Sequence, residues 1–237
     1  MTGIIGTTAD RGYAICTSGR SGSNLLCQYL ASTGLLGRPR EYFNAPGRRM
    51  FDDPDYPDGR EKQIEQVLTT GATANGIYGI KMFPEYIDAV AEALPWTQRL
   101  PNLRFVLLRR HDLLGQAISF VRGLQTSQWR STVPAQDTPS YDGDLIYERL
   151  RGIVRDYARW ELFFARNGIA PARVAYETLV DDPQGCVDQV AGMFGLAGRT
   201  PIDRTQITLQ VQRDALTEEW RARFLAERRD LDRMDAL

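Results

Sequence analysis

Residues 15–26, ICTSGRSGSNLL, join an apolar run, a turn of glycine, serine and arginine, and a second apolar run that favours a helix. A strand that ends in such a turn and continues directly into a helix collects backbone N–H groups and the positive end of the helix dipole in one concavity. The sequence therefore predicts an anion site here. The alternative is an ordinary helix N-terminus, capped by Ser21 or Ser23.

The turn differs from two common nucleotide-binding loops. A Walker A loop reads G-x-x-x-x-G-K-[ST], whereas residues 19–24 read GRSGSN. The turn also lacks the G-x-G-x-x-G pattern of dinucleotide-binding folds. These differences argue against an ATP-dependent kinase or ATPase and against a dinucleotide site.

A resemblance to a known family accounts for the turn. Residues 17–24, TSGRSGSN, are similar to the 5′-phosphosulfate loop of sulfotransferases that use 3′-phosphoadenosine 5′-phosphosulfate (PAPS). Residues 109–119, RRHDLLGQAIS, resemble the segment of that family that holds the 3′-phosphate, and Arg110 and Ser119 match its arginine and serine. Two anion sites on successive elements suit a nucleotide with two separated anionic ends.

The resemblance is closest to the bacterial trehalose 2-sulfotransferase type. Four segments agree in order and spacing, and several matches are much less expected by chance than one. They are residues 18–23, residues 41–43 (EYF), residues 76–81 (GIYGIK), and residues 116–120 (QAISF) followed by Gln125, Thr126 and Trp129. The resemblance implies sulfuryl transfer from PAPS to a hydroxyl of a carbohydrate-like small acceptor, such as trehalose or a related glycan or glycolipid. It also implies PAP as the product, no metal, and a homodimer.

Such a transfer needs a base for the acceptor hydroxyl and cations for the developing negative charge. By resemblance, Glu41 is the expected base, with a pKa that burial raises toward neutrality. Arg20 is expected on the 5′-phosphate and the transferring sulfonate, and Lys81 as a second cation in the same cleft. The alternative for Glu41 is a surface charge pair with Arg40. The alternative for Arg20 is a solvent-facing turn residue, and that for Lys81 is a strand-end cap. His111, the single histidine, is expected to pack or to start a helix rather than to act as the base.

The other expected contacts fall into two groups. The nucleotide group is Ser18, Gly19, Arg20, Ser21, Gly22, Ser23, Asn24, Arg110, Ser119, Tyr176 and Arg213. The acceptor group is Glu41, Tyr42, Phe43, Trp129 and Arg130, whose aromatic faces and donors suit a sugar ring. Core packing is the alternative for Trp129, and a helix cap explains the segment after Tyr176 without a ligand.

Short apolar runs and amphipathic stretches define the elements that position these residues. Strands are predicted at residues 13–17, 77–82, 103–108 and 173–176, and helices at 22–33, 112–128 and 145–164. This alternation predicts an α/β protein: a P-loop-like three-layer fold with a central, mostly parallel sheet flanked by helices. We expect one domain over residues 1–237, with loops at 44–60, 130–143 and 197–213 as acceptor-site or lid segments.

Composition sets further limits. A net charge of −1 excludes the broadly basic surface of a nucleic-acid-binding protein, so an anion must be held by a local cluster. Three cysteines without metal-like spacing predict buried free thiols, and the chain shows no secretory or membrane-spanning segment, so we expect a soluble, cytoplasmic protein. Two alternatives to a sulfotransferase stay open: an ATP-dependent P-loop phosphotransferase and a non-catalytic PAP-binding module.

Overall fold

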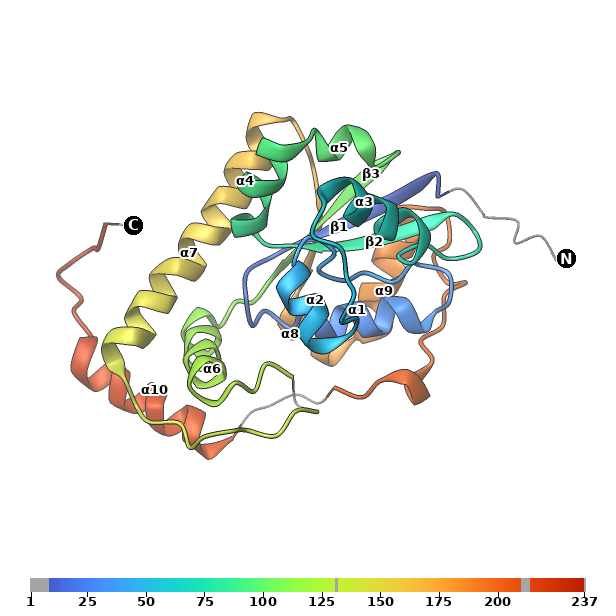
Figure 1. The fold of residues 1–237 in the computed structure, drawn as a ribbon. Coiled ribbons are helices and arrows are strands. Elements are labelled where there is room, and N and C mark those ends of the chain that lie inside the picture. The colour runs from blue at the N-terminus through green and yellow to red at the C-terminus, as the bar shows by residue number, and fades with distance from the viewer. Residues whose placement is uncertain (1–8, 131, 210–213, 237) are drawn as a thin grey trace, which may run out of the picture.

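A four-stranded parallel sheet forms the centre of the computed structural model, which describes residues 9–130, 132–209 and 214–236 (Figure 1). The strands are β1 (Arg11–Cys16), β2 (Ile77–Met82), β3 (Leu103–Arg109) and β4 (Ala172–Ala175), and their order is β2-β1-β3-β4. From β1 the chain continues to β2 on one side of β1, and it then places β3 on the other side. A ligand crevice is expected at such a switch point, outside the carboxyl ends of β1 and β3.

Alternating side chains of the strands enter two separate cores. On one face, Tyr13 and Ile15 of β1 pack in a buried apolar cluster with α1 (Ser23–Ser32), α8 (Tyr176–Asp181) and α9 (Pro183–Gly192). On the other face, Ala14 and Cys16 belong to a larger cluster with α3 (Arg60–Thr69), α4 (Pro84–Ala93), α6 (Leu113–Thr126), α7 (Gly143–Arg166) and α10 (Ala215–Arg228). The sheet is therefore covered on both faces, as parallel sheets are.

Helix α7 is the longest described element and runs diagonally beside the sheet in Figure 1, from α4 toward α10. Its buried stripe is Ile146, Ile153, Tyr157, Trp160 and Phe164. The Trp160 indole donates to the carbonyl oxygen of Thr17 at 2.9 Å. The core stripe of α7 therefore also holds the turn that follows β1.

The predicted three-layer α/β fold is confirmed, and the sheet is parallel throughout. Each predicted strand and helix is present with its ends shifted by a few residues. Helix α1 ends at Ser32, just before Gly34, which has a left-handed φ of 66°. All three cysteines are buried and free. Within the described residues, no helix is long and apolar enough to cross a membrane.

The prediction of a continuous loop over residues 44–60 is wrong, because α2 occupies Ala45–Phe51. Asn44 caps this helix: its Oδ1 accepts from the backbone N–H of Gly47 at 3.0 Å, and Pro46 lies in the first turn. The short helix α5 covers Trp96–Arg99. The segment 197–213 contains a 3₁₀ turn at Arg204–Gln206, and its residues 210–213 lie outside the described residues.

Candidate active site

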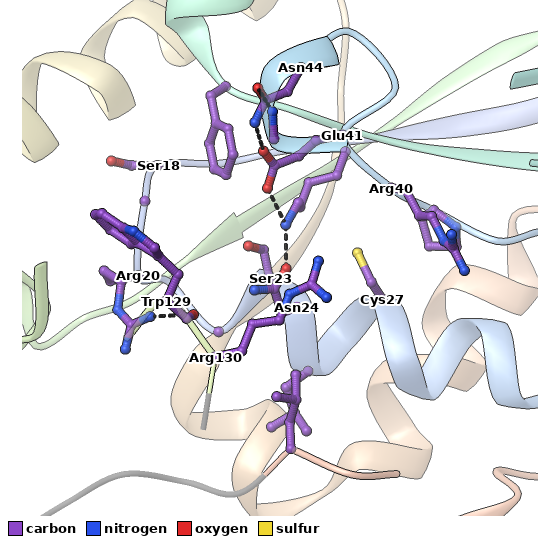
Figure 2. A pocket seen from close by; sticks show the side chains of 18 of the residues that line it. Ser18, Arg20, Ser23, Asn24, Cys27, Arg40, Glu41, Asn44, Trp129 and Arg130 are labelled. Atoms are coloured by element: carbon purple, nitrogen blue, oxygen red, sulfur yellow. Dashed lines mark hydrogen bonds and ion pairs between the residues drawn. The ribbon is translucent and has the colours of Figure 1, made fainter. Parts of the chain in front are cut away.

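A cavity of about 860 Å³ opens at the carboxyl ends of β1 and β3, at the switch point of the sheet. Figure 2 shows how side chains from the turn after β1, from the segment before α2 and from the end of α6 surround it. The expected site residues that line it are Ser18, Gly19, Arg20, Gly22, Ser23, Asn24, Glu41, Lys81, Arg110, Ser119, Trp129, Arg130 and Tyr176. Residues that are more than 150 positions apart in the sequence therefore line the same cavity.

The turn after β1 presents free backbone donors to this cavity. Gly22 is the N-cap of α1 with a left-handed φ of 84°, and it makes no side-chain cap hydrogen bond. The alternative of a Ser21 or Ser23 cap is therefore wrong. In the described part of the chain, the N–H groups of Gly22, Ser23 and Asn24 have no hydrogen-bond acceptor. This helix N-terminus also lacks an acidic residue in its first turn, so it is well suited to an anion.

Two serines of the turn have internal partners. Thr17 donates its hydroxyl to Ser21 Oγ at 2.6 Å, and Ser21 is fully buried and does not line the cavity. The expected direct contact of Ser21 with the nucleotide is therefore not one that its side chain can make. Ser18 donates its hydroxyl to Asp156 Oδ2 on α7 at 2.7 Å. Together with the Trp160 bond, this contact fixes the turn against α7.

Arg20 spans from the turn to α6. Its backbone has a left-handed φ of 62°, its Nε donates to Ser119 Oγ at 3.0 Å, and its Nη1 donates to the Trp129 carbonyl oxygen at 2.7 Å. Burial, followed by the charges of Arg110 and Arg122, lowers the pKa of Arg20. Several guanidinium groups of like charge thus converge on one partly buried place, which is an environment for a bound anion.

Glu41 and Lys81 form a partly buried ion pair beside the same turn. Lys81 Nζ lies 2.7 Å from Glu41 Oε1 and also donates to Asn24 Oδ1 on α1. The Lys81 side chain is 4% exposed, so its charge acts at short range on whatever occupies the cavity. The dashed lines in Figure 2 connect Asn44, Glu41, the lysine and Asn24 in one chain of contacts.

Asn44 orients the Glu41 carboxylate. Because Asn44 Oδ1 caps α2, its Nδ2 is left to donate, and it does so to Glu41 Oε2 at 2.7 Å. Burial alone raises the pKa of Glu41, but the charge and hydrogen bond of Lys81, the hydrogen bond of Asn44 and the charge of Arg130 outweigh it and lower that pKa. The expectation of a raised pKa is therefore wrong. The carboxylate is held in the ionised form, which is the form that accepts a proton.

A second cluster of cations lies at the other end of the site. Arg110, directly after β3, is 8% exposed, pairs with Asp112 Oδ2 at 3.1 Å, and lies 5.0 Å from the centre of the Tyr176 ring. Among the residues that the structure describes, its buried Nε has no hydrogen-bond partner. A smaller cavity of about 100 Å³ adjoins it and is lined by Ser119 and Arg221, among others.

Of the three aromatic residues that were predicted to contact the acceptor, Trp129 lines the cavity and the other two do not. Tyr42 is fully buried and Phe43 is 3% exposed; both belong to the apolar core, and neither lines the cavity. The prediction that they offer faces to an acceptor is therefore wrong. They anchor the segment that carries Glu41, since the Tyr42 hydroxyl donates to the Arg38 carbonyl at 2.9 Å. Trp129 does line the cavity, and its ring packs edge-on against Phe120.

Two expected residues remain to be placed. Arg213 lies outside the described residues. His111 is exposed beside α6 and does not line the cavity; its backbone N–H donates to the Glu177 carboxylate. No group of histidine, cysteine and acidic side chains suited to a metal ion occurs within the described residues.

Sequence reasoning missed several polar groups of the cavity. Asn44 could have been recognised, because an asparagine two residues before a proline is a typical helix cap. Glu85 and Tyr86 in the first turn of α4, and Asp156 on α7, also line the cavity. They occur in ordinary amphipathic stretches, so no local pattern distinguishes them from surface residues.

Comparisons with known proteins agree with this geometry. The family model for Stf0 sulphotransferase matches residues 12–227. The chain is 29% identical to a trehalose 2-sulfotransferase of Mycobacterium tuberculosis, over 92% of this chain and 96% of that protein. It is 26% identical to a trehalose 2-sulfotransferase of Mycolicibacterium smegmatis, over 93% and 96% of the two chains. Among solved structures, a sulfotransferase from Alicyclobacillus acidocaldarius shares the fold, with a TM-score of 0.51 at 15% identity over 92% of this chain and 96% of that one.

Proposed function

The chain belongs to the Stf0 sulphotransferase family, and from this premise we propose that it transfers the sulfuryl group of PAPS to a hydroxyl of trehalose or a related glycan or glycolipid. The observation that carries the proposal is that two candidate anion sites and one partly buried carboxylate share a single cavity. One anion site is the N-terminus of α1 with Arg20, and the other is Arg110 with Ser119. The carboxylate is Glu41, which its partners keep ionised.

The residues present fit a nucleotide with two anionic ends. The free N–H groups of Gly22, Ser23 and Asn24 suit the 5′-phosphosulfate. The buried, unpartnered Nε of Arg110 suits the 3′-phosphate, because an unpaired buried donor costs free energy until it is satisfied. When bound, PAPS supplies the sulfuryl group that the acceptor oxygen receives.

Glu41 acts as the general base. Its ionised carboxylate takes the proton of the acceptor hydroxyl as that oxygen becomes a nucleophile. Lys81 and Asn44 hold the carboxylate in place, so little reorganisation is needed during the reaction.

Arg20 and Lys81 provide the positive charge that the transfer requires. Both line the cavity beside the turn after β1, and Lys81 is buried. Negative charge that develops on the sulfonate and on the leaving phosphate is stabilised more strongly there than in open solvent. Glu41 and Lys81 belong to one connected hydrogen-bonded unit, and Arg20 lines the same cavity.

The test is sulfuryl transfer by a Glu41→Gln variant. Glutamine keeps the shape of the side chain but cannot accept the proton, so we expect the rate of transfer from PAPS to trehalose to fall about 10²- to 10⁴-fold. The dissociation constant for PAP, measured by calorimetry, should stay within a factor of three. Glu65→Gln, an exposed position on α3, is the matched control. Full activity in Glu41→Gln would contradict the assigned base.

The two alternatives predict different results. An ATP-dependent phosphotransferase requires magnesium, and its rate would follow the magnesium concentration. A non-catalytic PAP-binding module would bind PAP equally well in wild type and Glu41→Gln and would sulfate nothing. A cytoplasmic location, which is expected from the sequence, and a homodimer, which the resemblance implies, are further parts of the proposal; light scattering of the purified protein tests the homodimer.

A further inference from the structure

A chain of buried hydrogen bonds connects the two anion sites behind the cavity. The Gln116 amide on α6 donates from Nε2 to the Gly19 carbonyl oxygen at 2.7 Å. The Tyr157 hydroxyl on α7 donates to Gln116 Oε1 at 3.3 Å and accepts from the backbone N–H of Arg110 at 3.2 Å. Neither Gln116 nor Tyr157 lines the cavity. These two side chains therefore join the turn after β1 to the residue that follows β3.

The chemistry of the two ends fixes the direction of every hydrogen bond in this chain. A carbonyl oxygen only accepts, and a backbone N–H only donates. The Gly19 end therefore requires the amide nitrogen of Gln116, and the Arg110 end requires the hydroxyl oxygen of Tyr157 as its acceptor. The hydroxyl proton is then directed to Gln116 Oε1. A methionine at position 116 or a phenylalanine at position 157 would break the chain.

The burial of both side chains indicates a role beyond stability. Gln116 is 0% exposed and Tyr157 is 3% exposed, and Gln116 lies beside the buried apolar residues Ala117 and Ile118 of α6. The net contribution of a buried hydrogen bond to stability is small, so well-packed apolar side chains would stabilise these positions about as well. A fully satisfied buried polar network instead holds its members in one arrangement.

That arrangement includes backbone groups of both anion sites. At one end, the Gln116 bond holds the peptide between Gly19 and Arg20, and Arg20 has the disfavoured φ of 62°, which persists only where surrounding contacts hold it. A Cβ on Gly19 would clash with the Phe120 ring, so the turn lies directly against α6. At the other end, the Tyr157 bond holds the N–H of Arg110, whose guanidinium belongs to the second anion site.

We propose that Gln116 and Tyr157 are positioning residues that fix the spacing of the two anion sites, and that this spacing selects a 3′,5′-bisphosphate nucleotide over its 2′,5′ isomer. The inference rests on the proposed function and adds how the donor nucleotide is recognised. The two isomers carry the same groups and the same charge. Attraction to the arginines therefore does not separate them, whereas a fixed distance between the sites does.

The test is the dissociation constant of adenosine 2′,5′-bisphosphate divided by that of PAP, both measured by calorimetry. We expect a ratio of at least about 30 in wild type, because one charged group of the wrong isomer is left poorly paired. In Tyr157→Phe and in Gln116→Met the ratio should fall at least about fivefold. The first variant removes one oxygen and keeps the ring in the core. The second keeps a side chain of similar length without the amide.

Tyr78→Phe is the matched control. Tyr78 is a fully buried tyrosine on β2 that does not line the cavity, and its hydroxyl donates to the Pro101 carbonyl oxygen at 2.8 Å. Its loss should lower the melting temperature, as in Tyr157→Phe, but should leave the ratio at the wild-type value. The control thus separates a loss of stability from a loss of spacing.

Three results would overturn the inference: a ratio near one in wild type, a wild-type ratio in both Tyr157→Phe and Gln116→Met, or an equal fall in Tyr78→Phe. Thermal unfolding of each variant shows that the folded protein is being compared. Failure of wild type to bind PAP would instead contradict the proposed function itself.

Discussion

At the scale of single residues, the 2.7 Å contact between Lys81 and Glu41 controls the ionisation of the proposed base. Burial raises the pKa of the carboxyl, and the ammonium and the Asn44 amide lower it further than burial raises it. Glu41 therefore stays ionised below the pH at which an isolated glutamate gains its proton. A base of this kind relies on position rather than on a pKa near neutrality.

A Lys81→Gln variant should reverse that balance. Without the ammonium, the effect of burial prevails, the pKa of Glu41 rises above its usual value, and the ionised base is lost at a higher pH. We expect the acid limb of kcat to move upward by about one pH unit or more, in addition to a lower maximal rate. The measurement is kcat between pH 4 and 8 at saturating substrates, with Lys62→Gln on α3 as an exposed control. An acid limb at the wild-type pH would show that Lys81 does not control Glu41.

Arg20 combines a proposed role in nucleotide binding with backbone strain. A non-glycine residue with a φ of 62° is disfavoured, and its guanidinium is held by Ser119 and by the Trp129 carbonyl. We expect Arg20→Gly to be more stable than Arg20→Ala by about 1 kcal/mol in urea unfolding, because only glycine relieves the strain. Both variants should lose PAP binding. Equal stabilities of the two would contradict the strain argument.

At the scale of elements, α10 is fastened to α6 by two charged contacts near the smaller cavity. Arg122 grips both carboxylate oxygens of Asp214 at 2.7 Å, and Arg221 contacts Asp112 Oδ2 at 2.7 Å. Asp214 is also the N-cap of α10, since its Oδ1 accepts from the Thr217 N–H at 3.0 Å. The Asp214 side chain thus both caps the N-terminus of α10 and holds α10 against α6.

Asp214→Ala should lower the free energy of unfolding by about 1 to 2 kcal/mol through loss of the cap and the ion pair. Asp214→Asn, which can still cap, should lose less. The hydrogen bonds of Arg122 lower the pKa of Asp214 to about 2, because they outweigh the opposite effect of burial. The ionised Asp214 therefore stabilises the fold at any pH above the usual pKa of an aspartate. This stabilisation is lost as the pH falls toward 2. Urea unfolding at pH 7 and near pH 2 checks this; a difference from wild type that persists undiminished near pH 2 would contradict the assignment.

The sequence predicts elements better than the contacts between them. Buried parallel strands such as Ile77–Met82 are nearly continuous apolar runs, and the glycine-rich turn has a distinctive composition. Helix α2 was missed because its seven residues contain a proline, a glycine and two arginines and bury little surface. Tyr42 and Phe43 were assigned to the acceptor because their type suits a sugar, whereas their burial depends on core packing that no local pattern reveals. Glu85 and Asp156 line the same cavity because α4 packs against α7, which no local pattern predicts.

At the scale of the whole molecule, charge is unevenly distributed. The chain has a net charge of −1, yet the described wall of the main cavity carries more cations than carboxylates. An anionic nucleotide is therefore attracted by the cavity and not by the protein surface as a whole. Dissolved salt weakens this attraction. It screens the contribution of solvent-exposed charges strongly and that of buried charges much less.

We expect the dissociation constant for PAP to rise about tenfold between 50 mM and 500 mM NaCl. The KM for trehalose, which is uncharged, should change by less than about twofold over the same range. Calorimetry and initial rates supply the two values. Salt-independent binding of PAP would mean that the arginines and Lys81 are not the groups that hold it.

The most direct test of the account is calorimetric titration of the protein with PAP and, separately, with ATP and magnesium, for wild type and Arg20→Ala. The account predicts that wild type binds PAP without magnesium, that ATP with magnesium binds much more weakly, and that Arg20→Ala loses PAP binding. Failure of wild type to bind PAP, or a preference for ATP with magnesium, would contradict the assignment of the cavity to a sulfated nucleotide.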